Sequence, residues 1–162
     1  MHCGAIVLVV CTGNTCRSAM AQYILKRMLS DSVTGGRPQV RSAGIDAVAG
    51  RPMRPEARAA LEGLGLDGTR HRSHRLSQQD VDDANIILVM TRRQRKMMCL
   101  RFARAKDKTL LLTALGGRPK DIPDPCGEAE QAYVNCAQSI VRGLESGYGC
   151  LLERIGAKAP IR

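Results

Sequence analysis

The feature that most constrains this chain is a short, wholly apolar run near its start, AIVLVV at residues 5–10. The run is rich in β-branched residues and shows no alternation with polar ones. Such a run is typical of a strand buried on both faces of a parallel sheet. Parallel strands need long crossover connections, which are usually helices. The run therefore predicts an α/β fold.

Later segments repeat this alternation of apolar runs and helical stripes. We expect strands at 5–10, 39–44, 84–90 and 108–115. Helical spacing predicts helices at 18–29, at 54–65, after a cap at Thr91, and over one long stretch from 133 to 155. Strands separated by helices favour a parallel sheet with helices on both faces. With no repeats, linkers or low-complexity tracts, we expect one domain over residues 1–162.

Composition narrows the class of protein. The first residues, MHCGAIVLVV, lack the basic segment of a signal peptide, and no apolar run approaches the roughly 20 residues of a membrane span. We therefore expect a cytoplasmic chain without a membrane partner. Its seven cysteines have no framework spacing and form no Cys-x2-Cys pair, which favours reduced thiols and predicts neither a metal nor another cofactor.

The formal net charge of +10 favours anionic partners in general. Nucleic acid is the first candidate to weigh. Three tyrosines, one phenylalanine and no tryptophan offer few platforms on which bases could stack. The composition therefore does not favour a nucleic-acid partner.

The segment CTGNTCRS, from Cys11 to Ser18, lies where the first strand gives way to the first helix. Ligands of open α/β sheets bind at the carboxyl ends of strands, and a helix N-terminus directs backbone N–H groups at anions. Gly13 and Asn14 tolerate a positive φ, and the fork of Arg17 matches two phosphate oxygens. We predict a loop that holds phosphate or another oxyanion, formed by Thr12, Gly13, Asn14, Thr15, Cys16 and Ser18 with Arg17.

The Cys-x5-Arg spacing carries little information by itself. Cys136 and Arg142 repeat it, but they lie inside a helical stripe where no loop can form. We therefore interpret Cys136 as a core or flanking residue. The context of Cys11, between a buried strand and a helix, is what distinguishes the first pair.

Cys11 is placed to act as a nucleophile. A helix N-terminus and a nearby arginine favour the thiolate, the attacking form of cysteine, and Ser18 can hydrogen-bond it. Displacement also needs an acid for the leaving group. The proline-rich segment DIPDPCG offers Asp121 and Asp124, and Asp124, between two prolines, is the better candidate. No Walker motif occurs, so ATP binding does not follow.

These motifs together resemble the low-molecular-weight protein tyrosine phosphatases. The resemblance rests on VCTGNTCRSAMA, on DPCG, and on supporting matches at 41–44, 71–77 and 86–91. It implies a three-layer open sheet of four parallel strands and a metal-free mechanism. In that mechanism Cys11 forms a phosphocysteine, Arg17 holds the phosphate, and Asp124 protonates the leaving group and then activates water. The resemblance also implies a loop-supporting network of Asn14, Ser18, Ser42 and His71.

Three positions depart from the family's usual pattern. Ala19 stands where proline usually follows the loop serine, and His74 stands where arginine is common. Cys126 replaces the residue after Asp-Pro that is typically aromatic in tyrosine-specific members. The last departure removes a wall on which a phenol ring would stack.

The substrate depends on Thr15, where tyrosine-specific members usually carry a bulkier aliphatic residue. CTGNTCRS is similar to the loop of bacterial protein-arginine phosphatases in this family, so phosphoarginine in a phosphorylated protein is the favoured substrate. Phosphotyrosine is the alternative, and the positive charge of the chain weighs against a cationic leaving group. Thr15 could also serve only in packing.

Two further classes of protein could share this loop and fold. Thiol-linked arsenate reductases share this fold but need two more relay cysteines, and only Cys99 follows the third strand, where Met90 and Thr91 occupy the first relay position. A non-catalytic anion-binding module would not need nucleophile, arginine and acid together.

Cys16 adds a redox hypothesis. It lies five residues from Cys11 across a curled loop, and oxidised Cys11 could be captured as a disulfide before irreversible oxidation. The family resemblance supports this protective role. The alternative is a small buried residue that fills space.

Overall fold

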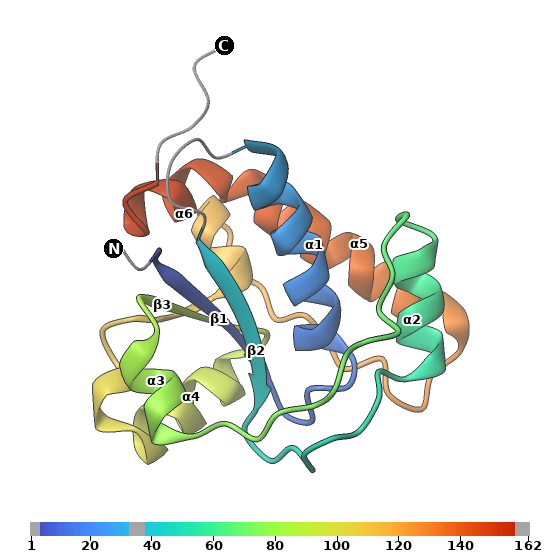
Figure 1. The fold of residues 1–162 in the computed structure, drawn as a ribbon, viewed down its shortest axis with the longest axis horizontal. Coiled ribbons are helices and arrows are strands. Elements are labelled where there is room, and N and C mark those ends of the chain that lie inside the picture. Colours follow the sequence, from blue (N-terminus) through green and yellow to red (C-terminus); the bar gives the residue numbers. More distant parts are fainter. Residues whose placement is uncertain (1–3, 33–37, 158–162) are drawn as a thin grey trace.

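The computed structural model describes residues 4–32 and 38–157. Its four strands are β1 (Ile6–Cys11), β2 (Gln39–Gly44), β3 (Ile86–Val89) and β4 (Thr109–Leu111). They form one parallel sheet in the order β2-β1-β3-β4 (Figure 1). The expected α/β class and four-stranded parallel sheet are confirmed.

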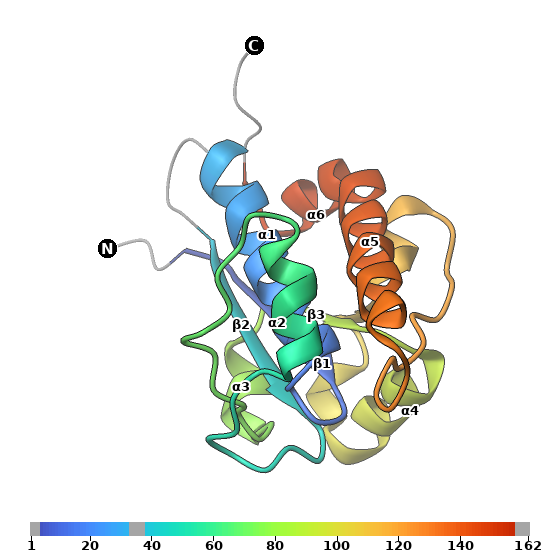
Figure 2. The ribbon, with the colours of Figure 1, turned by 90° about the vertical axis from the view of Figure 1, so that its right-hand side faces the viewer.

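Helices cover both faces of the sheet. Among the described residues the α-helices are α1 (Arg17–Ser32), α2 (Pro55–Glu62), α3 (Gln78–Asp83), α4 (Arg92–Arg101), α5 (Glu130–Ser146) and α6 (Tyr148–Arg154). Figure 1 shows α1, α2 and α5 on one side of the sheet and α3 and α4 on the other. In Figure 2 the helices α1, α2 and α5 lie side by side as one layer. The expected three-layer arrangement is therefore present.

β1 lies at the centre of this arrangement, and all six of its side chains are buried. Val7, Val9 and Cys11 pack into the core beneath α1 and α5. Leu8 and Val10 pack into the second core, with residues of α3 and α4. Because side chains alternate between the two faces of a strand, a strand covered on both faces needs apolar residues throughout. This burial explains the unbroken apolar run.

Two elements differ from the sequence-based expectation. The fourth strand ends at Leu111 and continues as the 3₁₀ helix η2 (Leu112–Gly116). The expectation of a single long C-terminal helix is wrong, because the chain forms two helices, α5 and α6, with a break at Gly147. A Cβ atom at Gly147 would lie 2.2 Å from the Cβ of Leu115. The close approach of η2 to the backbone at this point requires glycine.

The short helix α3 is an addition to the expected elements. Ser77 caps it, and a capping box joins Ser77 and Asp80 through reciprocal side-chain to backbone hydrogen bonds. The expected cap at Thr91 is confirmed, with a second capping box between Thr91 and Gln94 at the start of α4.

The strand order identifies the edge at which a ligand is expected. The chain passes from β1 to β2 on one side of β1 and later returns to place β3 on the other side. Such a reversal opens a crevice outside the carboxyl ends of the strands. The loop after Cys11 lies at this crevice, at the lower end of the strands in Figure 1.

Within residues 4–32 and 38–157, no helix is both long and apolar enough to cross a membrane.

Candidate active site

The loop of residues 12–16 joins the end of β1 directly to the start of α1. Its backbone turns at Asn14, whose φ is 55°, the only positive φ among the described non-glycine residues. Gly13 is not in this conformation, so the left-handed residue of the loop is Asn14 and not the glycine. Asparagine is among the residues that tolerate this region best.

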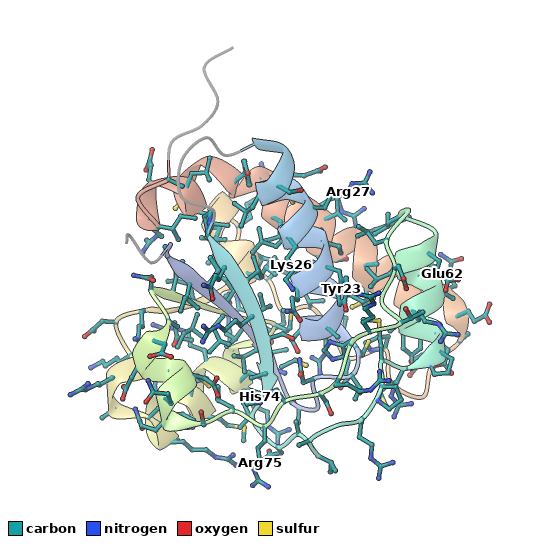
Figure 3. All side chains as sticks on the ribbon, in the orientation of Figure 1. Tyr23, Lys26, Arg27, Glu62, His74 and Arg75 are labelled. Atoms are coloured by element: carbon teal, nitrogen blue, oxygen red, sulfur yellow. The ribbon has the colours of Figure 1, made fainter. Side chains whose placement is uncertain are left out.

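Asn14 is held by hydrogen bonds at nearly every polar atom. Its Nδ2 donates to Ser18 Oγ at 2.8 Å and to Ser42 Oγ at 2.9 Å. Its Oδ1 accepts from the backbone N–H of His74 at 2.8 Å, and its carbonyl oxygen lies 2.6 Å from His71 Nε2. Figure 3 labels His74 beside the lower end of β2. The structure thus brings together the four residues of the expected network, and the backbone of His74 joins them.

His71 lies in a buried position against the edge of the Tyr23 ring. A carbonyl oxygen can only accept, so the Nε2 of His71 carries the hydrogen that it donates to Asn14. Burial lowers the pKa of His71 from its usual 6.5, although the hydrogen bond to Asn14 acts in the opposite direction. His71 is therefore neutral at neutral pH.

This burial predicts a pH dependence of stability. Just below pH 6.5 the unfolded chain binds a proton at His71 that the folded chain resists, so the free energy of unfolding falls as pH decreases through this range. In the variant His71→Gln, an N–H donor remains but does not titrate. Urea unfolding of both proteins at several pH values between about 5 and 7 should give the shallower slope for the variant. Equal slopes would contradict a buried, neutral His71.

Cys11 receives two polar contacts at its sulfur. The backbone N–H of Asn14 donates to Sγ at 3.3 Å, and Ser18 Oγ lies 2.9 Å from it. A serine hydroxyl donates when its partner is a thiolate. These contacts stabilise negative charge on sulfur, both in the free thiolate and in a departing one.

Arg17 connects the loop to the Asp-Pro segment. Its side chain is 5% exposed, and its Nη2 lies 2.5 Å from Oδ2 of Asp124. Nη1 also donates to the carbonyl oxygen of Ile122 at 3.3 Å. The other carboxylate oxygen of Asp124 accepts from the backbone N–H of Cys126 at 3.2 Å. Residues more than 100 positions apart in the sequence therefore meet at one site.

These groups line a cavity of about 210 Å³. Its lining residues are Cys11, Thr12, Gly13, Asn14, Thr15, Cys16, Arg17, Arg54, Asp124 and Cys126. A larger hollow of about 770 Å³ beside α4 and β4 contains none of them. Cys11, Arg17 and Asp124, expected from the sequence as nucleophile, phosphate-binding arginine and acid, share one small cavity, large enough for a phosphoryl group and the atoms attached to it.

Three site residues were missed by sequence reasoning, and two of them are Arg54 and Gln94. Arg54 lines the cavity, and its backbone N–H donates to the carbonyl oxygen of Thr15 at 2.9 Å. Gln94, buried on α4, donates to the hydroxyl of Thr12 at 3.2 Å. No local pattern indicates either contact, because each joins the loop to a segment about 40 or 80 residues away. The capping role of Gln94 had a signal in the sequence, but its contact with Thr12 had none.

Gly44, at the end of β2, is the third site residue that sequence reasoning missed. A Cβ there would lie 2.6 Å from the carbonyl oxygen of Thr12 and 2.9 Å from the backbone nitrogen of Asn14. Both neighbours are backbone atoms of the loop and cannot rotate away. Only glycine allows β2 to approach the loop so closely.

We therefore expect Gly44→Ala to distort the loop. Overpacking of this kind costs about 1–3 kcal/mol of stability, and the displaced loop should lower the catalytic activity expected of this site by more than this destabilisation explains. Thermal unfolding and kcat/KM measured side by side check this prediction. Gly50→Ala, where an added Cβ meets nothing within 4 Å but the φ is 82°, controls for the general cost of replacing glycine. Normal activity in Gly44→Ala would contradict the close packing of β2 against the loop.

Cys16 and Cys136 lie in contact. A hydrogen bond between their side chains, together with burial, raises the pKa of the Cys16 thiol. The same bond lowers the pKa of Cys136. Cys136 is buried on α5, as expected for a core residue, but its contact with the loop was not foreseen. Cys99 lines the larger hollow and not the cavity.

Among the described residues, no group of three or more His, Cys, Asp or Glu could hold a metal ion. His2 and Cys3 lie outside the described residues.

A parallel sheet that carries a cysteine loop before a helix N-terminus, with arginine and aspartate beside it, is the arrangement of a cysteine-dependent phosphatase. The family model described as low molecular weight phosphotyrosine protein phosphatase matches residues 6–159. The chain belongs to this family of enzymes.

Particular relatives include both substrate classes. A protein-arginine-phosphatase of Geobacillus stearothermophilus is 38% identical over 128 residues, which cover 78% of this chain and 82% of the relative. A low molecular weight protein-tyrosine-phosphatase of Acinetobacter johnsonii is 37% identical over 138 residues, which cover 84% of this chain and 89% of the relative. The solved structure of the YwlE arginine phosphatase from Geobacillus stearothermophilus superposes with a TM-score of 0.83 at 32% identity, covering 94% of this chain and 96% of that one.

Proposed function

We propose that residues 1–162 form one phosphatase domain that hydrolyses phosphoarginine in proteins through a phosphocysteine on Cys11. The observation that carries this proposal is the meeting of Cys11, Arg17 and Asp124 in one cavity of about 210 Å³. A phosphate in the loop would have the thiol beneath it, backbone N–H groups around it and a guanidinium beside it. Asp124, which lines the same cavity and contacts Arg17, is the acid.

In the first step the thiolate of Cys11 attacks phosphorus. An S–P bond forms, and the P–N bond of phosphoarginine breaks. Arg17 and the loop N–H groups bind the equatorial oxygens, where negative charge accumulates. Asp124 gives its proton to the departing guanidine nitrogen, so the product leaves as an ordinary arginine side chain.

In the second step water hydrolyses the phosphocysteine. Asp124, now a carboxylate, takes a proton from the water as its oxygen attacks phosphorus. The S–P bond breaks and inorganic phosphate is released. The departing Cys11 sulfur is stabilised by the hydroxyl of Ser18 and by the N–H of Asn14, which lie 2.9 and 3.3 Å away.

Three residues around the cavity bear on the choice of substrate. Thr15 is small and polar, and Cys126 at the rim offers no aromatic face, which suits a flat, polar guanidino group. The similarity to an arginine phosphatase adds support. Arg54 favours the second candidate, phosphotyrosine, since a cation at the rim opposes a cationic substrate side chain.

Initial rates on phosphoarginine-containing and phosphotyrosine-containing peptides test this choice, with Cys11→Ser as the blank. We expect phosphoarginine to be preferred and Thr15→Ile to reverse the preference by about 10–100-fold, because the bulkier aliphatic side chain fills the space beside the guanidino group. Thr15→Ser, which keeps the hydroxyl, is the matched control. A preference of the wild type for phosphotyrosine would overturn the substrate proposal.

A cytoplasmic site of action belongs to the same proposal. The mechanism needs Cys11 as a free thiol, and reducing compartments keep thiols in that state. Fractionation of the producing cells, with detection of this chain in each fraction, tests the location. Recovery in an oxidising compartment would contradict it.

A further inference from the structure

Three thiols lie in series between the loop and α5. Cys11 ends β1, Cys16 lies in the loop and Cys136 lies on α5, with exposed fractions of 3%, 6% and 5%. The three belong to one core cluster, and the side chains of Cys16 and Cys136 are hydrogen-bonded. The proposed mechanism uses only the first of them. The contact between the other two joins positions 120 residues apart in the sequence.

The contact is polarised in one direction. Cys16 donates its hydrogen, and the acceptor sulfur of Cys136 is the better place for negative charge. The bond lowers the pKa of Cys136 and the positive charge of Arg17 lowers it further, while burial and Asp124 act in the opposite direction. The attacking group in disulfide exchange is a thiolate. Of the two partners, Cys136 is therefore the nucleophile and Cys16 the residue it faces.

The pair also connects two cavities. Cys16 lines the proposed active-site cavity. Cys136 lines a second cavity of about 380 Å³, together with Asp124, Pro123 and Pro125 of the Asp-Pro segment. Asp124 forms part of both walls. A small thiol in the second cavity could reach Cys136 without entering the phosphate loop.

We propose that Cys136 is a second site of covalent modification, which takes a disulfide over from Cys11 and forms a Cys16–Cys136 bond that leaves the nucleophile free. The proposal rests on the proposed function in one respect: Cys11 must be the reactive thiolate.

The oxidant is a peroxide and the final reductant is a low-molecular-weight thiol. Peroxide converts the Cys11 thiolate to a sulfenic acid and releases hydroxide. The thiol of Cys16 attacks the Cys11 sulfur, an S–S bond forms, and water leaves. The Cys136 thiolate then attacks the sulfur of Cys16, and Cys11 departs as a thiolate. Two equivalents of the small thiol later reduce the Cys16–Cys136 bond and become its disulfide.

The expected consequence is activity in an oxidised protein. With the bond transferred, Cys11 again faces the cavity as a thiolate while Cys16 still supplies its backbone N–H to the loop. Phosphatase activity should therefore return after peroxide treatment before any reductant is added. A chain that lacks the third thiol should stay inactive.

Disulfide mapping of the wild-type protein tests this directly. The protein is treated with one equivalent of hydrogen peroxide, free thiols are alkylated, and tryptic peptides are analysed by mass spectrometry with fragmentation. Cleavage after Arg17, Lys120 and Arg142 keeps Cys11 and Cys16 in one peptide and places Cys136 in peptide 121–142. We expect a link between Cys16 and Cys136. A bond only within the first peptide would overturn the proposal.

Variants separate the alternatives. Cys136→Ser should retain the activity of the untreated protein, form only the Cys11–Cys16 bond, and lose recovery until dithiothreitol is added. Cys126→Ser removes the exposed thiol in the same tryptic peptide and should form the same Cys16–Cys136 link as wild type. Equal recovery in Cys136→Ser and wild type would overturn the inference. Absence of Cys11-dependent turnover in the untreated wild type would instead contradict the proposed function.

Discussion

Replacing Cys11 by serine will lower kcat by about 10⁴-fold or more while leaving the fold intact, because a serine hydroxyl is not ionised near neutral pH and removal of a nucleophile removes the whole covalent pathway. Cys11 is buried, and its sulfur contacts Ser18 and Asn14, so a hydroxyl of similar size fits the same place. Initial rates with a phosphorylated peptide, alongside thermal unfolding, give the comparison.

Cys136→Ser is the matched control for this prediction. Cys136 is equally buried and has the same Cys-x5-Arg spacing, but it lies on α5 and outside the proposed active-site cavity. Its activity should remain near that of wild type under reducing conditions. Comparable losses in both variants would show that burial of a polar group, and not loss of a nucleophile, explains the Cys11 result.

Asp124→Asn will lower kcat by roughly 10²–10⁴-fold on phosphoarginine, because the amide can neither protonate the leaving nitrogen nor activate water. The size of the loss should depend on the leaving group. p-Nitrophenol leaves without a proton, so for its phosphate ester only hydrolysis of the phosphocysteine is slowed. Stopped-flow absorbance should then show a burst of p-nitrophenol equal to the enzyme concentration, followed by a slow steady rate.

Asp121→Asn is the control for the acid. Asp121 lies three residues earlier and pairs with Arg92 through Oδ1 at 3.0 Å, outside the proposed active-site cavity. Its replacement should change kcat little and produce no burst. A loss in Asp121→Asn as large as that in Asp124→Asn would move the acid role away from Asp124.

Much of the fold could be predicted from local sequence because its central strands, β1 and β3, are wholly buried. The run around Val7 and Val9 has one explanation, a strand covered on both faces, and the strand positions follow from it. The break at Gly147 could not be predicted in this way. The apolar stripe continues through it, and the cause is the approach of Leu115 from a different element.

The same distinction between local sequence and packing of distant segments applies to the site. The cysteine loop is local, so the position of Cys11 at the end of β1 and the left-handed Asn14 could be predicted from one short segment. Arg54 and Cys136 reach the loop only through the packing of α2 and α5, and nothing near them in sequence indicates the contact. The helical context of Cys136 predicted its burial correctly, but it gave no sign of the contact with Cys16.

The central claim is that a phosphoryl group passes through Cys11, and trapping it is the most direct measurement. Asp124→Asn is mixed with excess p-nitrophenyl phosphate, quenched with acid during the steady state, digested and analysed by mass spectrometry. The account predicts one added phosphoryl group on the peptide that contains Cys11, at close to one per enzyme, and none when Cys11 is also replaced by serine. Continued turnover with no phosphorylated Cys11 peptide would contradict it.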